Sequence, residues 1–177
     1  MRPGASVETR RLLLRPPCAA DREAWTAFLA DERATRFIGG VQGAHGAWRN
    51  LAMMMGAWEL DGFGMFSVIE RASGHWIGRI GPWRPVGWPG PEIGWALAPA
   101  CRGHGYATEA ARASMDWARD RLGWTRVIHL IRPDNTPSIA LARRLGSTPV
   151  LGYDTTLVGG DAPLLVYGRD LPPVGVR

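Results

Sequence analysis

Apolar residues recur along the chain at spacings that predict both strands and helices. Residues 7–15 contain an Arg-Leu-Leu-Leu-Arg run and stop at two prolines, which indicates a first strand. Asp21 is placed to cap a helix, because apolar residues at helical spacing follow it. A second helix is predicted from Trp48 to Trp58, and the residues assigned to its buried face are Trp48, Leu51, Met55 and Trp58.

The middle of the chain predicts three antiparallel strands and one loop. Residues 65–70 and 76–80 are two apolar runs around an Ala-Ser-Gly turn, which is typical of a hairpin. Residues 81–91 contain four prolines and three glycines among eleven residues, so we expect an irregular loop there. Residues 92–98 are the next predicted strand.

The second half of the chain alternates helices and strands. A helix is predicted over residues 105–122, with a face of small residues that would let it approach a sheet closely: Ala107, Ala110, Ala111, Ser114, Ala118 and Leu122. Residues 127–131 are nearly all apolar, as in a central strand that is covered on both faces. Thr136 is predicted to cap another helix, with Pro137 in its first position and Gly146 at its end.

Two further apolar runs, residues 153–157 and 164–169, predict a closing pair of strands. Strand 92–98, the helix after it and strand 127–131 form a crossover, whose strands should be parallel and whose hand should be right. The other neighbouring strands are expected to be antiparallel. We therefore predict the α/β class, of the α+β type: a mixed, mostly antiparallel central sheet of about seven strands, in a single domain spanning residues 1–177.

Composition excludes more functions than it identifies. The net charge is +5, and all 21 basic residues are arginines scattered along the chain, so a nucleic-acid interface is not predicted. A polyanionic small ligand would also suit this modest excess of positive charge. No apolar stretch is long enough to cross a membrane and no signal peptide is apparent, so we expect a cytoplasmic protein without a membrane partner.

Neither the cysteines nor the histidines are spaced as metal ligands. Cys18 and Cys101 form no Cys-x-x-Cys pair, and we expect both to be reduced. The four histidines show no ligand spacing, so no metal is predicted; His129 lies in an apolar strand and is expected to be a hydrogen-bonded core residue. Cys101 precedes a glycine-rich turn that would lower the pKa of its thiol, although nothing else indicates a nucleophilic cysteine.

The most informative segment is that glycine-rich turn, residues 102–110, between a predicted strand and a predicted helix. The start of a helix presents unpaired backbone N–H groups and the positive end of its dipole. Gly103 and Gly105 let the backbone curl and a ligand come close, Arg102 adds a charged fork, and Thr108 adds a hydroxyl. The turn is predicted to bind an anion such as pyrophosphate, although a purely structural turn is an equal alternative by spacing alone.

Four blocks in fixed order resemble the GNAT acetyltransferase superfamily. They are Glu-Ile-Gly-Trp-Ala-Leu-Ala-Pro at residues 92–99, Arg-x-x-Gly-x-Ala-Thr-Glu-Ala at 102–110, Pro-Asp-Asn-Thr-Pro-Ser at 133–138, and Leu-Gly at 145–146. The opening Glu-Thr-Arg-Arg-Leu-Leu-Leu-Arg at residues 8–15 is similar to that of the RimJ/RimL-like branch, which includes protein N-terminal acetyltransferases. The resemblance implies the acyl-CoA N-acyltransferase fold, with splayed strands, and acetyl-CoA as the co-substrate.

The resemblance also implies cofactor contacts at matching positions. The backbone N–H groups that would hold the CoA pyrophosphate belong to Arg102, Gly103, His104, Gly105, Tyr106 and Ala107, with Thr108 beside them. The pantetheine arm would pair with the strand edge at Trp95, Ala96 and Leu97. Asn135 matches the family's asparagine near the pantetheine, and Ser138 lies one turn further along.

Glu92 and Ser138 are the candidate catalytic residues. Acetyl transfer needs a neutral amine, a polarised thioester carbonyl and a protonated leaving thiolate. Glu92 is the candidate general base, directly or through a water, and a structural carboxylate is the equal alternative. The family's frequent tyrosine acid is missing, because Leu141, Ala142 and Arg143 occupy its helix. Ser138 is the nearest substitute, unless it only bonds its own backbone in the first turn.

The acceptor implied by the resemblance is a primary amine, either a small molecule or a protein N-terminus. Trp83 and Trp88, in the proline-rich segment, would either line its pocket or plug the loop. The leading interpretation is an N-acetyltransferase that works by direct attack in a ternary complex, and a homodimer is left open. The alternatives are a non-catalytic CoA-binding sensor or interaction module and, on charge alone, an RNA-binding protein.

Overall fold

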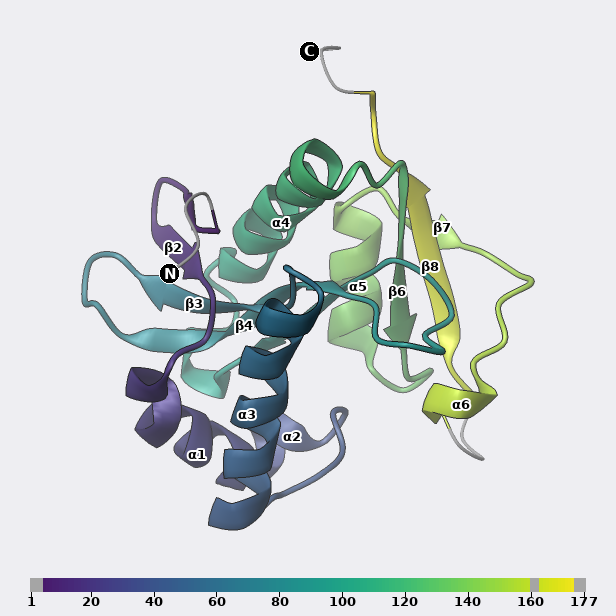
Figure 1. Ribbon diagram of the computed structural model, residues 1–177. Helices are drawn as coiled ribbons and strands as arrows, with labels where there is room; N and C mark the ends of the chain where they lie inside the picture. Colours follow the sequence, from purple (N-terminus) through teal and green to yellow (C-terminus); the bar gives the residue numbers. More distant parts are fainter. Residues whose placement is uncertain (1–4, 160–162, 174–177) are drawn as a thin grey trace.

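A mixed sheet with helices on both faces forms the middle of the molecule (Figure 1). The computed structural model describes residues 5–159 and 163–173. The strands of this part are β1 (Val7–Glu8), β2 (Leu12–Arg15), β3 (Phe66–Glu70), β4 (Trp76–Trp83), β5 (Glu92–Leu97), β6 (Arg126–Ile131), β7 (Thr148–Pro149) and β8 (Leu165–Asp170). The helices are η1 (Ala19–Asp21), α1 (Arg22–Ala30), α2 (Glu32–Thr35), α3 (Ala44–Leu60), η2 (Pro99–Cys101), α4 (Tyr106–Leu122), α5 (Thr136–Arg144) and α6 (Thr156–Gly159).

The strand order confirms the predicted class and crossover. Within the described residues the sheet has eight strands, one more than expected, in the order β1-β2-β3-β4-β5-β6-β8-β7. β5 and β6 are parallel and are joined through α4, whereas the other neighbours are antiparallel. None of the helices in residues 5–159 and 163–173 is long and apolar enough to cross a membrane.

The first predicted strand is divided by a tight turn. The Thr9 backbone N–H donates to the Leu12 carbonyl at 2.8 Å, so β1 and β2 form a small hairpin in which Val7 faces Leu14. Asp21 does not cap α1 with its side chain. Its carboxylate instead accepts hydrogen bonds from Arg15 and from the Ser67 hydroxyl, which tie η1 to the sheet.

Helices α1, α2 and α3 cover one face of the sheet, and α4 covers the other with α5 beside it. The predicted small face of α4 is correct in large part, because Ala110, Ala111, Ser114 and Ala118 are all buried. The predicted face of α3 is half wrong, since Trp48 and Met55 are 55% and 38% exposed. The residues that are buried are Ala47, Leu51, Met54 and Trp58. Two of these four positions, Ala47 and Met54, lie one residue before the predicted ones.

Two irregular segments also differ from prediction. Residues 81–83 were expected in a loop but continue β4, with Pro82 opposite Ile93. Pairing of β4 with β3 ends at Ile80, so Pro82 meets no second strand that needs its missing N–H. Residues 153–157 are not a strand, because Asp154 accepts hydrogen bonds from the backbone and hydroxyl of Thr156 at the start of α6; β7 pairs with β8 instead.

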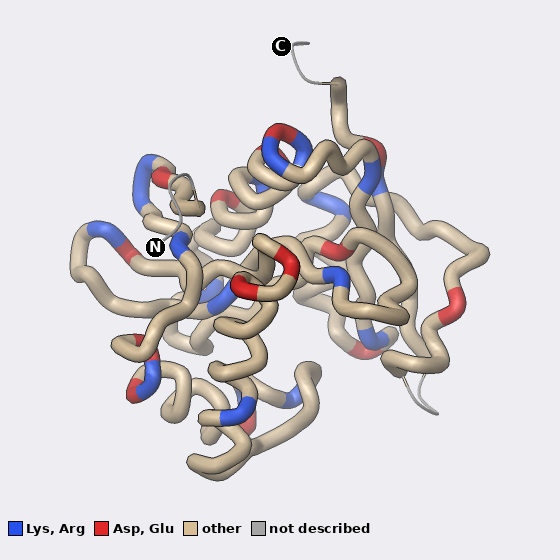
Figure 2. The backbone as a smooth tube through the Cα atoms, viewed as in Figure 1, with Lys and Arg blue, Asp and Glu red and all other residues tan. Residues whose placement is uncertain are grey.

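The cap of α5 lies one residue earlier than predicted. Asn135 is the N-cap, and its side-chain oxygen accepts from the Ser138 backbone N–H at 3.3 Å, whereas Thr136 and Pro137 are inside the first turn. The arginines are spread over many elements, as the scattered spacing predicted (Figure 2).

Candidate functional site

The strands β5 and β6 separate soon after they meet. Their one paired register position is Glu92 with Ile128, where the Ile128 N–H donates to the Pro91 carbonyl at 2.8 Å. Beyond it, side chains bridge the gap: the Leu130 N–H points to a Glu92 carboxylate oxygen at 3.4 Å, and the His129 ring lies 2.7 Å from the Ile93 carbonyl. Beyond Glu92, the edge of β5 that faces β6 therefore has no strand partner.

Two adjoining cavities open at this separation. The larger is about 620 Å³ and is lined by every residue assigned to the cofactor except His104, namely Trp95, Ala96, Leu97, Arg102, Gly103, Gly105, Tyr106, Ala107, Thr108, Asn135 and Ser138. The smaller is about 110 Å³ and holds Glu92. Trp95, Asn135 and Ser138 line both cavities, so the two spaces meet at the splayed end of β5.

The glycine-rich turn has the geometry of an anion site. Gly103 and Gly105 adopt φ of +83° and +79°, which only glycine accepts without strain. Gly105 is the N-cap of α4, and it supplies no side chain to cap the first amides of this 17-residue helix. Arg102 and Arg144 line the same cavity, so the helix dipole and two guanidinium groups favour a negatively charged ligand there.

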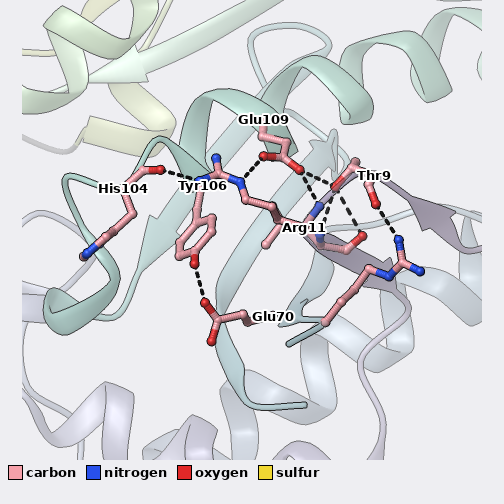
Figure 3. A network of polar contacts seen from close by, with 8 residues as sticks. Thr9, Arg11, Glu70, His104, Tyr106 and Glu109 are labelled. Atoms are coloured by element: carbon pink, nitrogen blue, oxygen red, sulfur yellow. Dashed lines mark hydrogen bonds and ion pairs between the residues drawn. The ribbon is translucent and has the colours of Figure 1, made fainter. Parts of the chain in front are cut away.

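A clasp formed by Thr9, Arg11 and Glu109 holds this turn against the β1–β2 hairpin (Figure 3). One Glu109 oxygen accepts from the Thr9 hydroxyl at 2.6 Å and from the Arg11 backbone N–H at 2.9 Å, and the other accepts from Arg11 Nε at 2.7 Å. Arg11 Nη1 then donates to the His104 carbonyl at 2.8 Å. Because the His104 carbonyl oxygen accepts this hydrogen bond from Arg11, it would repel an anion at the turn less strongly.

Tyr106 extends the clasp toward β3. The Arg11 guanidinium lies 4.6 Å from the centre of the Tyr106 ring, and the Tyr106 hydroxyl donates to Glu70 (Figure 3). Tyr106 thus lines the larger cavity with its hydroxyl already bonded to Glu70.

The expectation that the pKa of the Cys101 thiol is lowered is wrong. Burial, together with the negative charge of Glu70, raises the pKa of this thiol.

Glu92 is a buried carboxylate at the wall of the smaller cavity. It is 7% exposed and accepts from Trp88 Nε1 at 2.7 Å as well as from Leu130. Burial raises its pKa from 4.5 to about 7, although the hydrogen bonds from Trp88 and Leu130 act in the opposite direction. Glu92 is thus hydrogen-bonded, as a structural carboxylate would be, and its raised pKa is also what a general base would need, so both interpretations stay open on geometry.

Ser138 and His129 lie on either side of Trp95. Trp95 Nε1 donates to the Ser138 hydroxyl oxygen at 3.1 Å, so Ser138 is held by an indole and keeps its own O–H as a donor. His129 is buried as predicted, with one ring nitrogen at the Ile93 carbonyl and the other 2.9 Å from the Ser147 hydroxyl. Burial lowers the pKa of His129 to about 4, which keeps it neutral.

The two candidate acceptor tryptophans line neither of these cavities. Trp83 is buried in the cluster between the sheet and α1–α3, and its ring meets that of Trp88 edge-on at 6.3 Å. Trp88 reaches the site only through its bond to Glu92. Sequence reasoning missed Arg79, which lines the smaller cavity. An arginine inside an otherwise apolar strand was the signal that could have found it.

Glu92 and His129 make opposite contributions to the pH dependence of stability. Because its pKa is raised, Glu92 contributes to the unfolding free energy. This contribution is complete below pH 4.5 and is lost as the pH rises to about 7. The lowered pKa of His129 adds stability that is full above pH 6.5 and lost as the pH falls to about 4. These two contributions are each roughly 3 kcal/mol and nearly cancel between pH 7 and pH 4.

In Glu92→Gln, the pH dependence of stability should show the contribution of His129 without the opposing contribution of Glu92. Between pH 7 and pH 4 we expect the variant to lose about 3 kcal/mol more unfolding free energy than the wild type. Urea unfolding at a series of pH values measures this difference. Parallel pH curves for the two proteins would contradict the raised pKa of Glu92.

Comparison with known proteins adds to this geometry. A family model described as the acetyltransferase (GNAT) domain matches residues 11–148. The uncharacterised N-acetyltransferase YnaD of Bacillus subtilis (strain 168) is 29% identical over 141 residues, which make up 79% of this chain and 81% of YnaD. The family match covers most of the chain, including the turn, β5 and α5.

Solved structures share the whole architecture. An acetyltransferase from Agrobacterium tumefaciens strain C58 is 32% identical, with a TM-score of 0.80 and 93% of each chain covered. RimL, a ribosomal L7/L12 α-N-protein acetyltransferase solved in complex with coenzyme A, is 18% identical, with a TM-score of 0.74 over 94% of this chain and 98% of RimL. The likeness to RimL is one of fold.

Among the described residues, no group of three His, Cys, Asp or Glu side chains could hold a metal ion.

Proposed function

The chain belongs to the acetyltransferase (GNAT) domain family, and from this premise we propose that it transfers the acetyl group of acetyl-CoA to a primary amine. One observation carries the proposal: a glycine-rich turn with two arginines beside it and a buried carboxylate with a pKa of about 7 lie on two cavities that meet where β5 and β6 separate. The turn suits the phosphates of acetyl-CoA, and the carboxylate can accept the proton that the amine must lose.

The larger cavity suits the elongated, anionic form of acetyl-CoA. The first amides of α4, with Arg102 and Arg144, would hold the pyrophosphate. The free edge of β5 at Trp95–Leu97 would pair with the amide groups of the pantetheine arm, because β6 has moved away from it. RimL, which shares this fold, has been captured with coenzyme A, and this supports the same use of the cavity here.

The chemistry follows from the groups at the meeting point of the cavities. Glu92 accepts the proton of the amine, directly or through a water, and frees its lone pair to attack the thioester carbonyl. A carbon–nitrogen bond forms, the carbon–sulfur bond breaks, and the Ser138 hydroxyl relays the second proton of the attacking nitrogen to the departing thiolate. A β5 backbone N–H polarises the carbonyl, and Trp95 fixes the Ser138 oxygen at 3.1 Å.

The non-catalytic CoA-binding alternative is not favoured. A sensor needs the larger cavity only, whereas this chain also keeps Glu92 buried beside a second cavity despite the cost of burying a carboxylate. We extend the proposal to the RimJ/RimL-like branch on the strength of residues 8–15, whose Thr9 and Arg11 build the clasp behind the turn.

A binding and turnover assay tests the proposed function. Acetyl-CoA at 100 times its Kd should raise the unfolding free energy by about 2.7 kcal/mol, and an amine acceptor should then release free CoA thiol. Binding without thiol release from any of a broad panel of amines would contradict acetyl transfer. Absence of binding would contradict the cofactor assignment itself.

Gly105→Ala should weaken acetyl-CoA binding by about tenfold, because an alanine at φ +79° strains the turn by roughly 1–2 kcal/mol and shifts its amides. Gly123→Ala is the matched control, since Gly123 has φ +68° at the other end of the same helix. Both variants should lose similar stability, but only the first should lose affinity in calorimetric titration with acetyl-CoA. Equal affinities would argue against binding at the turn.

A further inference from the structure

The smaller cavity contains a cation that the proposed acetyl transfer does not use. Arg79 on β4 is 7% exposed; its Nη1 contacts the sulfur atoms of Met54 and Met65, each at 3.5 Å, and its guanidinium carbon lies 5.9 Å from the centre of the Trp25 ring. Its Nε has no hydrogen-bond partner. Thioether sulfur is a weak acceptor, so among the described residues this guanidinium has no partner that matches its charge.

Arg79 keeps its positive charge in this position. Burial lowers its pKa to about 10, which leaves it protonated at neutral pH. No described carboxylate forms an ion pair with it within 4 Å, although the charge of Glu92 acts on it from across the cavity. A buried cation without an anion is costly, and an anionic group of a ligand would remove that cost.

The sheet places Arg79 and Glu92 at two ends of one hollow. Arg79 pairs with Ala96 and Gly81 with Gly94, and Glu92 lies two residues before Gly94 on β5. Paired residues on antiparallel strands point to the same face, and every second residue shares it. On this face the Met65 side chain lies against Gly94, and Arg79, Glu92 and Met65 all line the smaller cavity.

Charge and size limit what this hollow can take. Arg132, about half-exposed, lines the same cavity, and its Nε lies 4.0 Å from the Asp134 carboxylate. His129, which also lines it, is neutral. One buried cation, Arg79, and one buried carboxylate, Glu92, therefore face the cavity, which suits a ligand that carries one group of each charge. The volume of about 110 Å³ suits a small molecule rather than a folded protein surface.

We propose that Arg79 binds a carboxylate of the acceptor, so that the acetylated substrate is a small amine of amino-acid type, with its amine at Glu92 and its carboxylate at Arg79. This inference rests on the proposed function, because Glu92 defines the amine end. A guanidinium recognises a carboxylate through parallel N–H···O bonds, which fixes the orientation of the substrate as well as its charge.

The wild-type enzyme provides the first test. The probes are the common amino acids, each compared with its carboxamide and with the same amine lacking the carboxyl group, and the measurement is CoA thiol release from acetyl-CoA. We expect kcat/KM to favour the carboxylate form by about 10- to 100-fold, the effect of one charged hydrogen-bonding partner. Equal kcat/KM for the carboxylate and carboxamide forms would overturn the inference.

Arg79→Met provides the second test, because methionine fills similar space beside Met54 and Met65 without the charge. The preference should disappear through a rise in KM for the carboxylate form, while acetyl-CoA affinity stays unchanged. The melting temperature should rise, since an unpaired buried charge has been removed. Arg79→Lys keeps the charge without the planar fork and should retain part of the preference.

Arg132→Met is the matched control, because this arginine lines the same cavity near solvent. It should keep most of the preference; a preference that is lost in this variant and kept in Arg79→Met would overturn the assignment. Turnover of peptides with no turnover of amino acids would also overturn it while leaving acetyl transfer intact. No thiol release with any amine, although acetyl-CoA binds, would instead remove the proposed function and the inference together.

Discussion

Replacing Glu92 with glutamine should lower kcat by about 10²- to 10⁴-fold, the usual contribution of a general base. Glutamine keeps the size of the side chain and can still accept from Trp88 Nε1, which lies 2.7 Å from the carboxylate in the wild type. The KM for acetyl-CoA should change little, because Glu92 lines only the smaller cavity. Steady-state thiol release with a reactive amine measures both constants.

The pH profile separates a base from a structural carboxylate. The ionised form of Glu92 is the active one, and its pKa is about 7, so kcat of the wild type should rise with pH through 7 and then level off. The rise should be absent from Glu92→Gln. Asp21→Asn is a suitable control: Asp21 is also buried and hydrogen-bonded, but it lies in η1, outside both cavities.

The control should cost stability and leave the rise near pH 7 in place. A Glu92→Gln variant with wild-type kcat, or with the same rise through pH 7, would assign proton removal to another group and leave Glu92 a structural role.

Glu109→Ala should lower the unfolding free energy by about 2–3 kcal/mol. The substitution removes the acceptor of the Thr9 hydroxyl, of the Arg11 backbone N–H and of Arg11 Nε, and it leaves a partly buried guanidinium without its carboxylate. Arg11 then loses its fixed position over Tyr106 and at the His104 carbonyl, so acetyl-CoA should also bind more weakly. Urea unfolding and calorimetric titration measure the two effects.

Asp116→Ala is the matched control on the same helix. Asp116 is 64% exposed in its pair with Arg119, and such surface pairs contribute about 0–1 kcal/mol. Acetyl-CoA affinity should be that of the wild type in this variant. If Glu109→Ala costs no more than Asp116→Ala, the clasp does not stabilise the turn.

Local sequence was enough to predict the elements that line the larger cavity. Gly103 and Gly105, followed at once by a helix, have few other conformations available, because positive φ and an open helix start are properties of the chain itself. The small residues Ala110, Ala111 and Ala118 likewise determined which face of α4 meets the sheet. The strand, turn and helix order then required the parallel crossover, whichever side chains came next.

Tertiary structure alone decided the rest. Burial raises the pKa of Glu92, and groups that surround it, such as Leu130, lie far from it in sequence. The rotation of α3 depends on what packs beneath it, and helical spacing alone left Met54 and Met55 equally suited to the core. The position of Arg79 is informative only because β4 buries it at the wall of the cavity that also contains Glu92. Backbone conformation is set over a few residues, whereas desolvation and charge pairing depend on atoms that only the fold brings together.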